Sequence, residues 1–144
     1  MFATIFEYMF TATDPQALTA YAAANPNAVA VSAADTELTY AELDSWSNRL
    51  ARVLIATGAR PGASVAVAVS RSVELMVVTW AVAKAGATMA GSAAESVLAV
   101  TTKSDRTQVA DVADVLLLDD LSTMRRYMTV SDAAVTAADF DMAA

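Results

Sequence analysis

The sequence holds few side chains that could carry out chemistry. Its 144 residues include no histidine and no cysteine, so the commonest general base, the commonest metal ligand and any thiolate nucleophile are missing. Gly86 and Gly91 frame four residues as in a phosphate-binding loop, but Ser92 and Ala93 follow where that loop needs lysine and then serine or threonine. We interpret the two glycines as a helix end and a tight turn. We assign no catalytic, cofactor-binding or metal-ligating residue, and we expect no cofactor.

Asp119 and Asp120 form the most suggestive acidic pair, because they follow the apolar run 115–118. Carboxylates at the end of a buried strand are typical of the acidic pocket of a response-regulator receiver. That pocket also needs a phosphorylatable aspartate and a lysine on later strands, and the 24 residues after Asp120 contain no lysine. We therefore predict a solvated strand end here.

Large apolar or basic side chains could instead bind a partner or an anion. Four large apolar residues are candidates for a partner-binding surface: Trp46, Met76, Trp80 and Met89. Apolar residues at helical spacing more often form the core, which is the interpretation we prefer. Arg49 and Arg52 are three residues apart and could hold an anion, but a solvated helix face is the commoner use of such a pair.

Composition excludes several function classes. The chain is 56% hydrophobic and 17% charged, which is not a disordered composition. A net charge of −7 argues against a nucleic-acid partner. The longest apolar run, 75–83, is far shorter than the ~20 residues that span a membrane, and the apolar N-terminus carries Glu7 and no basic residue, unlike a signal peptide. We expect a cytoplasmic protein without a nucleic-acid or membrane partner.

The stretch from Glu37 to Gly58 is predicted to hold the central helix. Thr39 and Glu42 have the spacing of a capping box, and Gly58 suits the end of the helix. Between them, apolar residues recur at three- and four-residue spacing: Leu43, Trp46, Leu50, Val53 and Leu54. This spacing is typical of an amphipathic helix with one buried stripe.

The remaining elements are predicted to alternate between helix and strand. Helices are expected from Asp14–Pro15 onward, over 73–85 after a Ser72 cap, over 104–112 and over 121–128; strands are expected at 28–32, 37–39, 65–69, 97–101 and 115–118. Such alternation predicts an α/β fold, with a flavodoxin-like, mostly parallel sheet flanked by helices. We expect an N-terminal arm (1–13), a single α/β domain (14–130) and a loosely ordered C-terminal tail (131–144).

Motifs in the first two thirds of the chain resemble a known family. L-T-Y-A-E-L at 38–43 and S-N-R-L-A-R at 47–52 resemble the start of the adenylation domains of nonribosomal peptide synthetases, which are adenylate-forming, AMP-binding ligases. Further segments follow in the family's order: 25–31, 60–67, 72–78 and 83–87. The resemblance is continuous from Leu18 to Ala87 and resumes more weakly at Val97. It implies the N-terminal subdomain of an enzyme family that activates an amino acid with ATP.

The departures from the family pattern concern its chemistry. After Gly86 and Ala87 the family's proline-containing loop and a helix opened by Tyr-Pro have no counterpart, since residues 88–94 lead almost directly to Val97. The phosphate loop ending in Pro-Lys-Gly, the aromatic-glycine-Thr-Glu segment that holds adenine and magnesium, and the C-terminal lysine also have no match. The resemblance therefore assigns no catalytic residue by position.

Three functional hypotheses remain. The first is a truncated and internally deleted adenylation-domain fragment without catalysis of its own. The second is a protein-interaction or oligomerisation module that docks on a synthetase or completes a split adenylation domain. The third, an α/β enzyme of another type, is disfavoured by the lack of a nucleophile motif.

The helix that the family has and this chain lacks would leave large apolar side chains in contact with water, at a cost of ~1.5–3 kcal/mol each. We therefore expect a homo-oligomer or a partner synthetase polypeptide.

Overall fold

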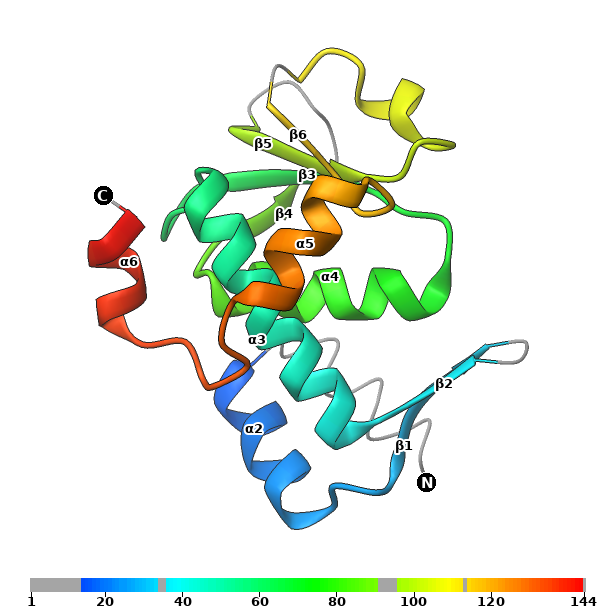
Figure 1. Ribbon diagram of the computed structural model, residues 1–144, viewed down its shortest axis with the longest axis vertical. Coiled ribbons are helices and arrows are strands. Elements are labelled where there is room, and N and C mark those ends of the chain that lie inside the picture. Colours follow the sequence, from blue (N-terminus) through cyan, green and yellow to red (C-terminus); the bar gives the residue numbers. More distant parts are fainter. Residues whose placement is uncertain (1–13, 34–35, 91–95, 113, 144) are drawn as a thin grey trace.

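The computed structural model describes residues 14–33, 36–90, 96–112 and 114–143 (Figure 1). The helices are α2 (Pro15–Ala24), α3 (Tyr40–Thr57), α4 (Ser72–Lys84), α5 (Leu121–Thr129) and α6 (Ala137–Ala143), and a 3₁₀ turn, η1, spans Arg106–Val109. The strands are β1 (Val29–Ala33), β2 (Thr36–Thr39), β3 (Ser64–Ala68), β4 (Thr88–Ala90), β5 (Leu98–Thr101) and β6 (Val115–Leu117). No helix in these ranges combines the length and apolar character needed to cross a membrane.

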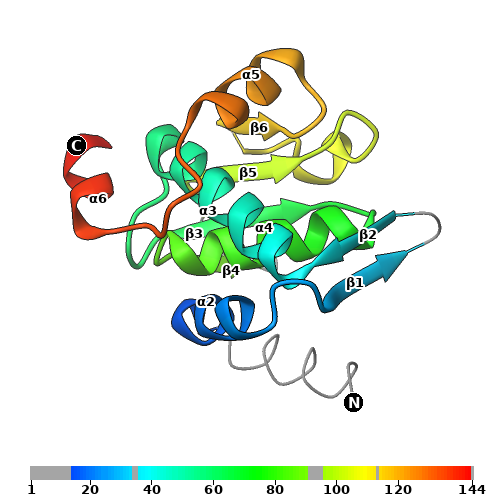
Figure 2. The same cartoon turned by 60° about the horizontal axis from the view of Figure 1, so that its bottom comes forward.

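Four of the strands form one parallel sheet in the order β4-β3-β5-β6, while β1 and β2 pair antiparallel as a separate two-stranded sheet. Helices α3 and α4 pack against one face of the parallel sheet, and α2 and α5 lie on opposite sides of α3 (Figure 2). The predicted α/β fold with a mostly parallel sheet flanked by helices is confirmed. Because β3 is followed by β4 on one side and β5 by β6 on the other, the sheet has a switch point between β3 and β5.

The two faces of the parallel sheet carry side chains of different size. Val65 of β3 and Leu98 and Val100 of β5 point into the main core beneath α3 and α4. On the other face Ala66, Ala68 and Ala99 form a small cluster, which Val109 and Val112 cover. The alternation of valine and alanine in the sequence predicted this division correctly. This second face therefore presents mainly alanines, not large apolar side chains.

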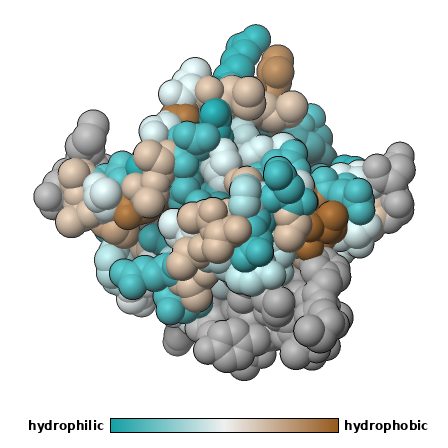
Figure 3. All heavy atoms as spheres, turned by 90° about the horizontal axis from the view of Figure 1, so that it is seen from below, coloured by the Kyte–Doolittle hydropathy of each residue, from teal (hydrophilic) through white to brown (hydrophobic). Residues whose placement is uncertain are grey.

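The large apolar residues that are exposed lie elsewhere. Leu121, Met124 and Met128 of α5 are 60%, 51% and 68% exposed, and Trp46 of α3 is 41% exposed. Seen from below, hydrophobic residues form separate brown spots among teal and pale ones (Figure 3). The exposed apolar surface thus lies mainly on α5, with smaller contributions from Trp46 of α3, Met89 of β4 and Val97 beside β5.

The central helix α3 begins and ends as the sequence predicts. The backbone N–H of Glu42 donates to Thr39 Oγ1 at 3.2 Å, and the N–H of Thr39 donates to Glu42 Oε1 at 2.9 Å, which completes the capping box. At the other end Gly58 has φ 130°, a conformation that favours glycine. Helix α2 also starts as expected, because Asp14 accepts from the N–H of Gln16 at 3.0 Å.

Three local predictions were wrong. Ser72 does not cap α4, because it is already the first helical residue and Arg71 precedes it without a side-chain cap. The helix expected over 104–112 shrinks to η1, since Asp105 bonds Ser70 and Thr102 instead of supporting a helix start. Strand β4 was missed, because its three residues carry no alternating pattern and gain their structure by pairing with β3.

The C-terminal segment follows α5 across the outer face of α3 to α6 (Figure 1). Helix α6 was not predicted, because its sequence is rich in alanine and aspartate and lacks an apolar stripe. The loose order expected for residues 131–144 stays a prediction. The structure adds the contacts that this segment makes, which are described below.

Candidate functional site

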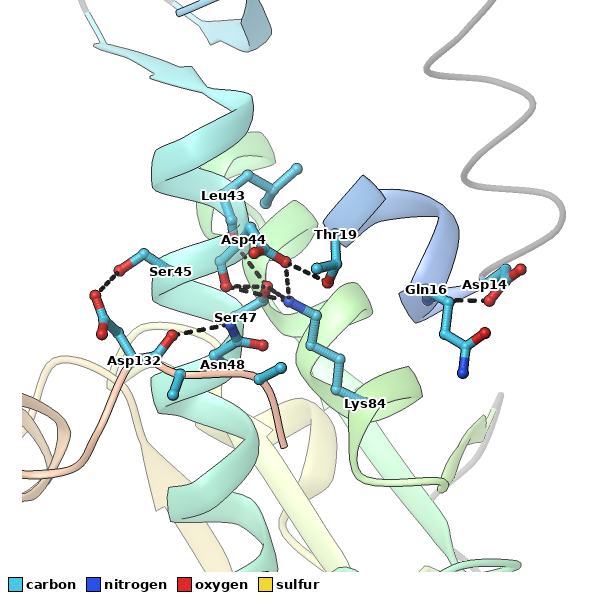
Figure 4. Close-up of polar contacts among 12 residues, drawn as sticks. Asp14, Gln16, Thr19, Leu43, Asp44, Ser45, Ser47, Asn48, Lys84 and Asp132 are labelled. Carbon is cyan, nitrogen blue, oxygen red and sulfur yellow. Dashed lines mark hydrogen bonds and ion pairs between the residues drawn. The ribbon is translucent and has the colours of Figure 1, made fainter. Parts of the chain in front are cut away.

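A buried polar cluster joins α2, α3 and α4 (Figure 4). Lys84 Nζ at the end of α4 donates to Asp44 Oδ1 at 2.8 Å, to Ser47 Oγ at 2.7 Å and to the Asp44 carbonyl at 3.1 Å. Thr19 of α2 donates to the same Asp44 oxygen at 2.9 Å. Burial lowers the pKa of Lys84, while the hydrogen bond from Lys84 to Asp44 acts in the opposite direction. The cluster therefore holds three helices together through one largely desolvated ammonium.

A lysine beside a serine is also an arrangement used for nucleophilic catalysis. In this cluster Ser47 is fully buried and its hydroxyl donates to the Leu43 carbonyl at 2.6 Å. All three protons of the Lys84 ammonium have acceptors on α3. Neither side chain is free to meet a substrate, so the geometry indicates a structural cross-link.

A second polar cluster lies at the carboxyl ends of β3 and β5, at the switch point where α/β sheets commonly bind ligands. Asp105 accepts from the Ser70 hydroxyl at 2.7 Å, from the Ser70 N–H at 3.0 Å and from Thr102 Oγ1 at 3.2 Å. The Ser70 hydroxyl, followed by the Ser70 N–H and Thr102, lowers the pKa of Asp105, which burial partly opposes. The cluster ties two loops together and directs its carboxylate at its own chain.

A pocket of about 760 Å³ opens beside this edge of the sheet, between α3, α4 and α5. Its apolar walls include Trp46 and Leu50 of α3, Val77 of α4, and Met124 and Tyr127 of α5. Burial raises the pKa of Tyr127, against a smaller opposite effect of the Arg49 charge. Its volume lies in the range of small-molecule sites, roughly 300–1,000 Å³, which are mostly apolar. Two arginines and two acidic residues also line it: Arg49, Arg71, Glu74 and Asp119.

Arg52, predicted to lie on a solvated helix face, is 14% exposed and fully engaged. Its guanidinium contacts both carboxylate oxygens of Asp139, at 3.0 and 3.2 Å. It also donates to the carbonyls of Ser131, Ala133 and Ala134. The prediction was wrong because the segment after α5 returns over this face of α3. Arg49, half-buried, donates to the carbonyls of Tyr127 and Met128 at 3.5 and 3.3 Å.

The structure separates the four large apolar candidates. Met76 and Trp80 are core residues at 4% and 1% exposure, whereas Trp46 and Met89 are 41% and 37% exposed. The core interpretation is therefore confirmed for the first pair and wrong for the second. Trp46 faces outward, while the polar side chains of Ser47 and Asn48 take buried positions with hydrogen-bond partners.

The remaining sequence candidates have structural roles. Asp119 is exposed and accepts from the Lys103 N–H at 3.0 Å, while Asp120 caps α5 through the Ser122 N–H at 3.2 Å. The Ser122 hydroxyl is the main cause that lowers the pKa of Asp120. Gly86 has φ 74° at the end of α4, and Gly91 lies outside the described residues. The described ranges contain no group of three acidic or histidine side chains placed to hold a metal ion.

Residues 18–125, three quarters of the chain, match the model of the AMP-binding enzyme family. The chain belongs to the AMP-binding enzyme family. The dimodular nonribosomal peptide synthase of Bacillus subtilis is 47% identical to it over 73 residues, which are 51% of this chain and 3% of that protein. Phosphinothricin tripeptide synthetase PhsC of Streptomyces viridochromogenes is 48% identical over 65 residues, 45% of this chain and 6% of that protein. The chain spans only a few per cent of these relatives.

Solved structures agree with the family assignment. A crystal structure of the nonribosomal peptide synthetase FmoA3 superposes with a TM-score of 0.68 at 26% identity, covering 85% of this chain and 14% of that one. The N-terminal domain of FACL13 from Mycobacterium tuberculosis gives the same TM-score at 23% identity, with 85% and 37% covered, and shows the shared fold. The chain thus contains part of an adenylation-type AMP-binding domain, with the fold of the N-terminal subdomain of adenylate-forming enzymes.

Proposed function

We propose that this chain forms the N-terminal scaffold of an amino-acid-activating adenylation domain and does not catalyse adenylation on its own. The parent reaction joins an amino-acid carboxylate to ATP and releases pyrophosphate. The observation that carries the proposal is that the polar side chains most like catalytic groups form hydrogen bonds within the chain itself. Lys84 and Ser47 bind each other between helices, and Asp105 binds its own loops. These polar side chains therefore hold the scaffold together and do not face a substrate.

The pocket gives further support, because it does not suit a nucleotide triphosphate. Its two arginines are balanced by two acidic residues, and Arg71 Nε lies 3.3 Å from Glu74 Oε2. A site for transferring phosphate groups instead concentrates positive charge or a metal ion at the phosphates. We expect the nucleotide and the amino acid to be bound by parts of an adenylation domain that these residues do not supply.

Amino-acid-dependent exchange of pyrophosphate into ATP tests the proposal. The purified chain should show only background exchange with each of the twenty amino acids. A complete adenylation domain of the family, assayed in parallel, confirms that the assay works. Isothermal titration calorimetry of the purified chain with ATP and magnesium should show no saturable binding. Amino-acid-dependent exchange that disappears when the chain is heat-denatured would overturn the proposal.

A second candidate, docking on another copy or on a synthetase polypeptide, is favoured by the exposed apolar face of α5. Leu121, Met124 and Met128 together leave more apolar surface in water than isolated exposed residues do. Sedimentation over a hundredfold range of concentration should then show self-association, and Met124→Glu with Met128→Glu should abolish it. A strictly monomeric chain that also binds no synthetase polypeptide rejects this candidate. We also propose that the chain is located in the cytoplasm, which cell fractionation tests.

A further inference from the structure

One polar stripe of α3 holds the segment that follows α5. Ser45, Asn48, Arg49 and Arg52 recur at three- and four-residue spacing and so lie on one face of the helix. Ser45 Oγ donates to Asp132 Oδ2 at 2.9 Å, and Asn48 Nδ2 donates to the Asp132 carbonyl at 2.9 Å (Figure 4). With the bonds of Arg49 to the last turn of α5, the stripe follows the chain from 127 to 139.

Arg52 is the centre of this contact. Five hydrogen bonds from its guanidinium reach four residues of the segment 131–139, which we call the strap: Ser131, Ala133, Ala134 and Asp139. Asp139 in turn accepts from the Thr136 N–H at 2.8 Å and so closes the turn that leads into α6. The Arg52 side chain therefore holds a nine-residue segment, 131–139, against α3.

The strap has few other attachments to the molecule. Residues 131–134 are exposed, and the apolar contacts with the main core come from two half-buried side chains, Val135 within the strap and Phe140 just after it. Segments with few buried apolar contacts and exposed hydrogen bonds open at a lower free energy than the core. The strap should therefore detach without unfolding the sheet.

Helix α5, which precedes the strap, is also thinly packed. Thr123 is its one buried residue, Tyr127 is half-buried, and the helix exposes Leu121, Met124 and Met128. It forms the outer wall of the pocket, opposite Trp46 and Leu50 of α3. Arg126 of α5 donates to Thr57 Oγ1 of α3 at 3.1 Å, and the strap that Arg52 holds on α3 adds a further restraint on the distance between α5 and α3.

We propose that the strap is a latch: bound to Arg52, it holds α5 against α3 and keeps the pocket narrow, and on release it lets α5 swing away and open the pocket. The device needs two states of the segment 121–139 over an unchanged core. Arg49 and Arg52 are positioning residues in this scheme. The pocket-lining side of α5 and the polar stripe of α3 become accessible together when the latch opens.

Hydrogen exchange of the full chain, followed by mass spectrometry, tests the latch. Arg52→Gln should speed exchange in 121–139 at least tenfold while leaving α4 and β5 as protected as before. Arg106→Gln, which removes an exposed charge from η1, is the matched control and should change neither region. Unchanged exchange in α5, or equal acceleration throughout the chain, overturns the proposal.

A covalent lock distinguishes release of a latch from loss of stability. Because the chain has no cysteine and the side chains of Ser45 and Asp132 touch, Ser45→Cys with Asp132→Cys can join strap and helix by a disulfide or a short thiol crosslinker. In the Arg52→Gln background the crosslinked protein should again show slow hydrogen exchange in α5. Reducing the disulfide, or omitting the crosslinker, should make exchange in α5 fast again. If hydrogen exchange in α5 stays fast in the crosslinked Arg52→Gln protein, the proposal is contradicted.

Discussion

Helix α3 carries an ion pair on each of two faces. On one face Asp44 meets Lys84 at 2.8 Å, and on the other Arg52 meets Asp139 at 3.0 Å. The first pair joins helices whose apolar sides form the main core, and the lysine side chain is only 3% exposed. The second joins α3 to an exposed segment with little apolar packing. Similar contact distances therefore predict different consequences, because the partner's packing decides what breaks when a pair is lost.

Asp44→Ala should have the largest effect on stability. It leaves the buried Lys84 ammonium without its carboxylate and removes the acceptor of Thr19. Losing one partner of a buried ion pair costs about 3–5 kcal/mol. Urea unfolding followed by circular dichroism measures this change.

The double variant Asp44→Leu with Lys84→Met is the control for that prediction. It removes the unpaired charge as well, so it should recover a large part of the loss, because apolar replacements of a buried pair are often nearly neutral. A double variant as unstable as Asp44→Ala would show that the cluster stabilises the helices by something other than the pairing of its charges.

Arg52→Gln should cost less global stability, about 1–2 kcal/mol, although it removes more hydrogen bonds. Bonds to charged groups are worth roughly 1.5–3 kcal/mol each only when their loss leaves buried groups unpaired. The carbonyls of the strap can instead turn to water once it detaches. The same urea experiment should give a smaller change than for Asp44→Ala, and an equal or larger change would place the strap within the cooperative core.

Thr39→Ala should cost about 1 kcal/mol, the usual value of a helix N-cap. The Glu42 N–H loses its acceptor, and the reciprocal bond of the capping box is weakened. Thr39→Ser keeps the hydroxyl and is the matched control. Since the cap lies at the start of α3, before either ion pair, the loss should be the same in the Arg52→Gln background. Strong non-additivity would instead link the cap to the strap.

The sequence predicted α3 and the sheet beneath it better than it predicted the strap and its contacts. Apolar spacing located α3, and the alternation in 65–68 located a strand with one large and one small face. The same spacing misplaced Trp46, which is exposed. Periodicity assumes that a helix buries one apolar side, whereas α3 is enclosed by α2 and α4 on one side and by α5 and the strap on the other.

The strap contacts were invisible for a different reason. Arg52 and Asp139 are 87 residues apart in the chain, and nothing in the composition of 131–139 indicates where this segment returns. One signal was present: Ser45, Asn48 and Arg52 recur at helical spacing, so a polar partner for that face was a possible inference. One wall of the pocket comes from α5 and the opposite wall from α3, and the sequence did not indicate that these two helices face each other.

Acid should release the strap. The Thr136 N–H, and then the hydrogen bond and charge of Arg52, hold the pKa of Asp139 below its ordinary value of 3.8, against an opposing effect of burial. A carboxyl whose folded pKa is depressed contributes stability that is present above the unfolded value and lost as pH falls through the folded one. Between pH 7 and 5 the latch should be unaffected, and below about 3.8 it should weaken progressively.

Acrylamide quenching of Trp46, in a Trp80→Phe background that removes the buried second tryptophan, measures this release. The difference between this protein and its Asp139→Asn variant isolates Asp139, because other carboxyls with lowered pKa values, Asp105 and Asp120, titrate in both. The two proteins should differ at pH 6, and the difference should shrink as the pH falls below about 3.8 and the parent loses the charge that the variant never had. Equal quenching of the two proteins at every pH would mean that the strap is held by the backbone carbonyls alone, and that Arg52 needs no carboxylate to act as a latch.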